Sequence, residues 1–482
     1  MEGQPSENPR KAVSAEFRGT HDDLLHRLVR EGLPELLKAL EQRGRVLPRH
    51  VLAELERFCL CGDPLEGFAH LVCSDCGHHE IIPFSCKTRG FCPCCCGRRM
   101  AERAAAWCDH VLPVVPLRQW VLTFPWRRRF LLACHPEFVN GVLRVVMRVI
   151  FGWYRDRGKE MGLADVQTGA ASVFQRFGSA LNANFHIHSL VLDGTYARDG
   201  KGHLRFHPTA APSQDDIEGL TTTIAKRVER WLERRGYPGE GELSQTANEE
   251  DDAQLLLMAA SMEGRAALGP RAGRKTRRKG IPRNAESMPR RCAAVDGYNL
   301  HADVRVGSSD RKGLERLSRY LLRPPLAKAR IEEDENGDVV VGLKRAWSDG
   351  TTQIILSRLE FLERLVALVP PPGRNTVLYH GILAAHAAGR AEVVPRPSPK
   401  SKRAKATIKL VRPEVSSTES RWFPWAELLL RVFSVDALCC PQCIPDYVCG
   451  SRNATRDTRH MAAPSPSGFT VDGPWPTSFV GW

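Results

Sequence analysis

The sequence lacks any uncharged apolar stretch long enough to cross a membrane. None of its 482 residues belongs to an apolar run of about 18 residues, the length that indicates a transmembrane helix. The first eight residues also lack the apolar core of a secretory signal peptide. We therefore predict neither a membrane protein nor a secreted one, and we expect the chain in the cytoplasm, associated with the nucleoid.

Acidic residues are in the minority among the charged ones. Lys and Arg total 69 against 55 Asp and Glu, which gives a formal net charge of +14. Such an excess favours a polyanionic partner, and nucleic acid is the usual one. Charge alone leaves open a merely basic soluble protein. The composition, 42% hydrophobic and 26% charged, is that of a globular chain with room for about two to four domains.

The 16 cysteines do not indicate a disulfide scaffold, because the chain is long and has no secretion signal. Seven of them lie between positions 73 and 96, a density typical of metal binding in a reducing compartment. A CxxC pair lets two thiolates reach one ion, and two pairs separated by fifteen residues suit a zinc ribbon. We predict a structural Zn²⁺ on Cys73, Cys76, Cys92 and Cys95.

The same segment offers further ligands and a basic face. Candidates for a second zinc site are Cys61, Cys86, His78 and His79. Cys94 and Cys96 make the register ambiguous, and we interpret both as bystanders. Arg98 and Arg99 follow the last cysteines and could contact DNA phosphates. The alternative is a structural ribbon with a solvated basic face.

Residues 185–192 predict one buried strand, because they are mostly apolar strand formers and a turn signal ends them. Residues i and i+2 of a strand share a face, so His186 and His188 project together. Two adjacent imidazoles are half of a divalent-metal site. The pair alone fits two histidines on a half-exposed strand equally well. A helix with a tyrosine at residues 312–322 favours the metal site.

Strand and helix patterns alternate around the histidine strand. Residues 119–124 and 170–177 have strand patterns, residues 142–154 form a strongly apolar helix, and residues 217–235 a basic amphipathic one. This order is compatible with a ferredoxin-like domain with an antiparallel sheet, a fold that the family resemblance described below implies and that periodicity alone does not show. We therefore predict an α+β fold in which a helical, zinc-ribbon-like N-terminal module precedes such a domain.

Several phrases of the sequence resemble one family. They include residues 174–182, the histidine–hydrophobic–histidine strand, and the helix end Arg319-Tyr320-Leu321-Leu322-Arg323-Pro324-Pro325. With residues 120–125, 349–352 and 379–384, and with the cysteine-rich segment in front, these phrases resemble the HUH nucleases of rolling-circle insertion-sequence transposases. Within that family, the insertion-sequence-common-region group is the most similar. The resemblance spans about residues 58–443.

The resemblance implies a transposase that nicks and rejoins single DNA strands, at single-stranded or hairpin element ends. Tyr320 is implied as the nucleophile that forms a 5′-phosphotyrosine, and His186 and His188 as ligands of Mg²⁺ or Mn²⁺. Gln175, on the strand expected to pair with the histidine strand, is the candidate third ligand. Its rivals are Asp193 and His301.

Some members of the family carry a second tyrosine four residues from the first. Here Arg316 and Pro324 occupy those positions, so the resemblance is to the single-tyrosine members. A second subunit would then supply the second tyrosine, and we expect a homo-oligomer. Arg316, Arg319 and Arg323 lie within about one helical turn of Tyr320, where we expect them to bind DNA or activate the phenol.

The predicted domains follow the chain in order. They are a disordered tail (1–20), a helical and zinc-binding DNA-binding domain (21–110), the nuclease domain (115–390) with a basic insertion or flexible arm (239–291), a linker (391–420) and a C-terminal tail (421–482), which departs from the family as a truncated end would. Two other functions remain open. One is a rolling-circle replication initiator, and the other a zinc-containing DNA-binding protein with a decayed nuclease site.

Overall fold

The computed structural model describes residues 16–17, 23–72, 79–237, 253–282, 290–395 and 458–459. They form two compact units, a smaller one that includes Leu60–Cys86 and a larger one that includes Asp23–Cys59 and Lys87–Ser401. Most of the predicted N-terminal tail, linker and C-terminal tail lies outside the described residues. None of the helices within the described ranges is long and apolar enough to cross a membrane.

The smaller unit is built on a β-hairpin. Its strands β2 (Phe68–Val72) and β3 (His79–Pro83) pair antiparallel. Two short strands, β1 (Glu16–Phe17) and β17 (Thr458–Arg459), flank them in the order β1-β3-β2-β17. A single helical turn, η1 (Pro64–Glu66), precedes β2. The predicted zinc-binding region therefore contains a hairpin, as a ribbon-like module requires.

Helices form the N-terminal part of the larger unit. They are α1 (Leu24–Glu41), α2 (Arg49–Cys59), α3 (Pro93–Ala106) and the π-helical turn η2 (Trp107–Val111). Asp23 caps α1 by accepting a hydrogen bond from the backbone of His26. Leu25, Leu28, Leu36 and Leu40 lie on the buried side of α1, whereas Leu37 is exposed.

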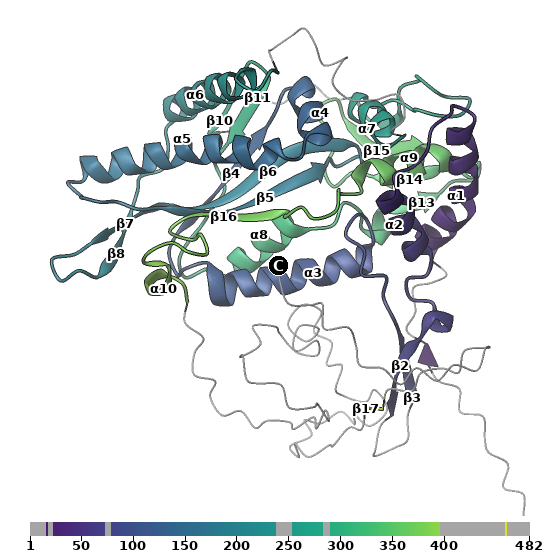
Figure 1. The fold of residues 1–482 in the computed structure, drawn as a ribbon, viewed down its shortest axis with the longest axis horizontal. Helices are drawn as coiled ribbons and strands as arrows, with labels where there is room; N and C mark the ends of the chain where they lie inside the picture. The colour runs from purple at the N-terminus through teal and green to yellow at the C-terminus, as the bar shows by residue number, and fades with distance from the viewer. Residues whose placement is uncertain are drawn as a thin grey trace, which may run out of the picture. The chain divides into compact units, whose positions relative to one another are not determined.

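A seven-stranded antiparallel sheet is the centre of the larger unit (Figure 1). Its order is β10-β11-β4-β6-β5-β16, and β12 also pairs with β4. The strands are β4 (Leu117–Thr123), β5 (Gly169–Phe177), β6 (Ala183–Leu192), β10 (Cys292–Val295), β11 (Tyr298–His301), β12 (Arg305–Val306) and β16 (Val377–Gly381). Taken in chain order, β4, β5, β6 and β11 lie in the ferredoxin-like order 4-1-3-2. The predicted α+β class and antiparallel sheet are confirmed.

The two faces of this sheet are covered by different helices (Figure 1). On one face, Trp120, Ile187 and Val191 share a core with α5 (Phe138–Glu160) and α6 (Gln214–Glu233). On the other, apolar residues of β4, β5 and β6 share a core with α8 (Arg311–Leu322) and η2. Because neighbouring residues of a strand face opposite ways, His186 and His188 point toward the α8 face.

A second antiparallel sheet has the order β13-β14-β15-β9. Its strands are β13 (Ile331–Glu333), β14 (Val339–Gly342), β15 (Thr351–Leu356) and β9 (Arg277–Gly280). Helices α7 (Ala253–Glu263) and α9 (Arg358–Leu368) pack against each other beside it. The basic segment predicted as a flexible arm is therefore folded where the structure describes it. Arg277 also pairs with Asp338 at 2.6 Å, which explains why this basic run is ordered.

The remaining elements are short. They are α4 (Trp126–Cys134), the hairpin of β7 (Gly194–Arg198) and β8 (Leu204–Pro208), the turn η3 (Lys328–Arg330) and α10 (Arg390–Val393). Helix α4 follows directly after β4 and contacts β6.

Candidate nuclease site and metal centre

The two histidines lie on β6, between β4 and β5. His186 stands opposite Thr123 on one side and Gln175 on the other, and His188 stands opposite Val121 and Val173. The exposed fractions of the two histidines are 8% and 4%, and their ring centroids are 4.8 Å apart. Both imidazoles therefore project from the same face of the sheet, as the sequence predicts.

Hydrogen bonds fix the orientation of both rings. The Nδ1 of His186 donates to the carbonyl oxygen of Asn184 at 2.8 Å, which leaves Nε2 as the ligand atom. The Nδ1 of His188 lies 2.8 Å from the Gln119 amide. A metal on Nε2 of His188 requires the proton on Nδ1 and the amide oxygen of Gln119 facing it. Sequence reasoning missed Gln119, although it lies on the same face of β4 as Val121.

Burial keeps both imidazoles in the neutral form that binds metals. It lowers the pKa of His186 to about 4, with the charges of Arg323 and Arg129 contributing in the same direction. Burial also lowers the pKa of His188 well below its ordinary value, helped by the neighbouring His186 and by Arg323. Neutral histidines would not have to lose a proton before binding a divalent cation at neutral pH.

Gln175 is placed to complete the ligand set. It is 3% exposed and directly opposite His186. Its Nε2 donates to the carbonyl oxygen of Leu321 at 2.6 Å, whereas its buried Oε1 has no hydrogen-bond partner among the described residues. A buried oxygen without a donor is costly and is the atom that Mg²⁺ or Mn²⁺ would take. Two imidazole nitrogens and this oxygen fit such an ion.

The two rivals of Gln175 are less suited to the site. Both carboxylate oxygens of Asp193 are bound by Arg118, at 2.8 and 2.9 Å, and one is also bound by Arg305. His301 is on β11, separated from the histidine strand by β4, or about 10 Å in the plane of the sheet. Asp193 is a buried ion-pair partner here, and Gln175 remains the candidate ligand.

Helix α8 brings Tyr320 to the histidines. Asp310 caps the helix by accepting from the backbone of Gly313 at 2.7 Å. Leu314, Ser318 and Leu321 form its buried face, while Tyr320 is 36% exposed. Its ring centroid lies 6.0 Å from that of His188. Two residues far apart in the sequence thus form one accessible site.

Two cations lie over the Tyr320 ring. Arg323 is 4.2 Å and Lys344 is 4.6 Å from the ring centroid. Arg323 was expected from the sequence, but Lys344, which follows β14, was not, because nothing local to it signals the contact. Arg319 instead pairs with Glu315 at 2.6 Å, and Arg316 is exposed.

Tyr379 is partly buried and packs against the core shared by α8 and η2. Its hydroxyl accepts a hydrogen bond from Trp107 Nε1 at 2.8 Å. Burial raises the pKa of Tyr379, which makes it a poorer nucleophile.

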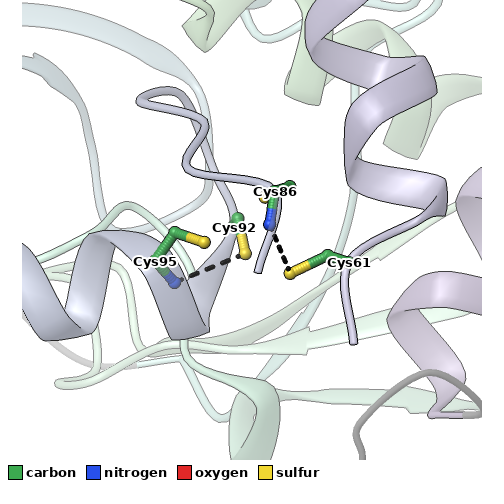
Figure 2. Close-up of side chains that lie close together, drawn as sticks. All are labelled: Cys61, Cys86, Cys92 and Cys95. Carbon is green, nitrogen blue, oxygen red and sulfur yellow. Dashed lines mark hydrogen bonds between the residues drawn. The ribbon is translucent and has the colours of Figure 1, made fainter. Parts of the chain in front are cut away.

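Four cysteines form the metal centre: Cys61, Cys86, Cys92 and Cys95. Their sulfurs all lie within 4.8 Å of one another, and Figure 2 shows them converging on one point. Cys92 caps α3, with its sulfur 3.5 Å from the backbone nitrogen of Cys95. The sulfur of Cys61 accepts from the backbone of Cys86 at 3.4 Å. Four thiolates at this spacing fit a tetrahedral Zn²⁺, for which Zn–S is about 2.3 Å.

This grouping corrects the zinc prediction from the sequence. Cys92 and Cys95 are in the cluster as expected, but Cys61 and Cys86, the candidates for a second site, complete it. Cys73, Cys76 and His78 lie outside the described residues.

The basic residues after the cluster make contacts within the chain. Arg98 pairs with Glu102 at 2.9 Å while remaining half-exposed. Arg99 donates to the backbone carbonyls of Thr88 and Lys87, which closes the cysteine-bearing loop onto α3.

Comparison with known proteins finds two family matches along the chain. Residues 33–124 match the family of transposase zinc-binding domains, and residues 169–390 match the family described as "Putative transposase". Both families are described by their relation to transposases. All four clustered cysteines fall in the first match, and the histidines, Gln175 and Tyr320 fall in the second.

A curated transposase is similar over most of its length. The transposase for insertion sequence element IS801 of Pseudomonas savastanoi pv. phaseolicola is 23% identical over 340 residues, which cover 68% of this chain and 69% of that protein. No solved structure matches the chain. The similarity to transposases thus comes from sequence comparison, and the arrangement of the site from the fold described above.

Proposed function

We propose that the chain is a transposase that nicks and rejoins single DNA strands through a 5′-phosphotyrosine at Tyr320, as in rolling-circle DNA transposition. One observation carries the proposal. The ring centroid of an accessible tyrosine on α8 lies 6.0 Å from that of His188, one of two buried histidines. The neighbouring Gln175 has an amide oxygen without a partner among the described residues. A tyrosine that only supported the fold would not need this arrangement.

The chemistry is a transesterification. The phenolic oxygen of Tyr320 forms a bond to the phosphorus while the bond to the 3′ oxygen breaks. The phenol gives up its proton to water, and the departing oxygen takes one up as a 3′ hydroxyl. One phosphodiester is exchanged for another, so a later 3′ hydroxyl can reverse the step without ATP.

The surrounding residues provide positive charge and fixed geometry. His186, His188 and Gln175 would hold Mg²⁺ or Mn²⁺, which when bound neutralises charge on the scissile phosphate and the departing oxygen. Arg323 and Lys344 place further positive charge where the phenolate and phosphate meet. The bond from Gln175 to the backbone of Leu321 fixes the end of α8 relative to β5, which orients the tyrosine.

The single tyrosine bears on the biology. With Arg316 and Pro324 four residues to either side, one subunit supplies one nucleophile from α8. We infer that the chain resembles the single-tyrosine insertion-sequence-common-region group and that a second copy makes the second cleavage. An active enzyme that stays monomeric at every stage would contradict this part.

A covalent-capture assay tests the proposal. The full chain is mixed with labelled single-stranded DNA from candidate element ends and Mn²⁺, and adducts that survive denaturation are counted. We expect an adduct in the wild type and in Tyr379→Phe, the matched control, but none in Tyr320→Phe or His186→Gln. An adduct retained in Tyr320→Phe would show that another residue is the nucleophile.

A further inference from the structure

An aromatic pair lies where the sheet meets the nuclease site. Strand β4 ends at Thr123, directly opposite His186, and α4 begins three residues later at Trp126. The rings of Trp126 and Phe130 are stacked, with an interplanar angle of 7° and centroids 6.2 Å apart. Phe130 packs against a small core that includes Phe185, whereas Trp126 is 38% exposed. Phe130 thus anchors a ring that remains accessible.

Arg129 lies on the same face of α4, because residues three and four apart on a helix are neighbours. Its Nη1 donates to Asn184 Oδ1 at 2.9 Å, and the backbone carbonyl of Asn184 accepts the hydrogen bond from His186. Its buried Nε has no partner among the described residues, and no carboxylate within those ranges forms an ion pair with it. A partly buried cation without an anion is costly and favours a negatively charged ligand.

The aromatic ring and the cation together point to one kind of ligand. Single-stranded nucleic acid presents unstacked bases, which stack on aromatic side chains, and phosphates, which pair with arginine. In duplex DNA the faces of the bases are already covered. An ordinary surface tryptophan would explain neither the parallel ring beneath Trp126 nor the unpaired cation beside it.

We propose that Trp126 stacks on one base of the single-stranded DNA near the scissile phosphate, and that Arg129 contacts a neighbouring phosphate. This inference rests on the proposed function, since it fixes where the substrate strand runs relative to His186. It makes α4 the element that sets which nucleotide reaches Tyr320.

Binding of abasic oligonucleotides tests the stacking contact. A fluorescent single strand is bound by the full chain, and a series of strands each lacks one base. In the wild type, we expect one position near the cleavage point at which base removal weakens binding by about 10-fold. Trp126→Ala should bind the intact strand about 10-fold more weakly and be insensitive to base removal at that position.

Three further variants make the result specific. Trp126→Phe should restore most of the affinity, because a smaller ring still stacks. Met161→Ala, which removes an exposed apolar side chain at the end of α5, should bind as the wild type does. Arg129→Gln should reduce the slope of log affinity against log salt by about one.

Two outcomes would overturn the inference. They are unchanged binding in Trp126→Ala, and an equal loss at every abasic position in the wild type. Adduct formation at Tyr320 is scored on the same strands. If no adduct formed but base removal at one position still weakened binding, the proposed chemistry would be contradicted and the stacking contact would still be supported.

Discussion

The four-cysteine cluster and the histidine–tyrosine site are built in different ways. The cluster takes its thiols from a short stretch of chain, and four thiolates leave no open position on a tetrahedral ion. The histidine site takes its groups from adjacent strands and from a helix far along the chain, and it keeps Tyr320 accessible. In the first site the metal would support the fold, and in the second the fold would hold the metal and its substrate.

The largest expected effect is therefore the loss of one cysteine from the cluster. Structural zinc sites contribute on the order of 10 kcal/mol to folding, so Cys61→Ser or Cys95→Ser should release zinc and abolish folding of the segment around it. Zinc content per chain and the far-UV signal measure this. Cys59→Ser, two residues from Cys61 and outside the cluster, is the control. If Cys61→Ser kept its full zinc content and Cys73→Ser lost it, the ligand set predicted from the sequence would be the correct one.

A substitution in the histidine site should have the reverse effect, with a large loss of cleavage and a small loss of stability. His186→Gln should reduce DNA cleavage by at least about 1,000-fold, a loss of about 4 kcal/mol in transition-state stabilisation. The free energy of unfolding should change by only about 1 kcal/mol, because the strand keeps its pairing with β4 and β5. Cleavage rate and urea unfolding are measured on the same preparation, with His207→Gln on β8 as the control. Loss of folding in His186→Gln would remove the contrast between the two sites.

The Asp193→Asn variant shows whether this residue supports the fold or binds the metal. Arg118 is 2% exposed, and its guanidinium binds both oxygens of this carboxylate. Asp193→Asn leaves that cation buried without its partner, and we expect about 3–5 kcal/mol of destabilisation. Asp199→Asn, on the exposed hairpin, should cost far less. Normal stability with a specific loss of metal-dependent cleavage would instead make Asp193 the third ligand.

The contrast also shows what a sequence can predict. The histidine pair was predictable because strand geometry alone sets the faces of residues two apart. The cysteine grouping was not, because CxxC spacing shows which thiols can share an ion but not which pairs meet in space. Cys61 and Cys86 carry no spacing signal toward Cys92.

Contacts between distant segments were the other gap. Lys344 reaches Tyr320 only because β14 and β15 form a sheet beside the candidate nuclease site. The sequence around Lys344 is that of an ordinary turn and does not predict this contact. Likewise β9 was predicted within a flexible arm, since its basic residues resemble a solvated tether. It is ordered by pairing with β15 and by the ion pair of Arg277 with Asp338, and neither is visible in local sequence.

The smallest predicted effect tests whether burial alone is enough to keep a histidine neutral. His380 on β16 is remote from the histidine strand in the sheet order, yet burial lowers its pKa to about 4, as it does for His186. Its Nε2 has no hydrogen-bond partner among the described residues. Between pH 6.5 and 4 the unfolded chain binds a proton at this position and the folded chain does not, so stability falls as the pH falls through that window.

His380→Gln should remove part of this pH dependence. We expect the loss of unfolding free energy between pH 7 and pH 5 to shrink by about 1–2 kcal/mol, because His380 is partly exposed and the full effect is about 2 kcal/mol. Urea unfolding at both pH values, without added metal, measures it, and His203→Gln on the exposed hairpin is the control. An unchanged pH dependence would mean that His380 gains a proton in the folded state at pH 5. Burial in the sheet alone would then not explain the low pKa of His186, and the neighbouring arginines would be needed as a further cause.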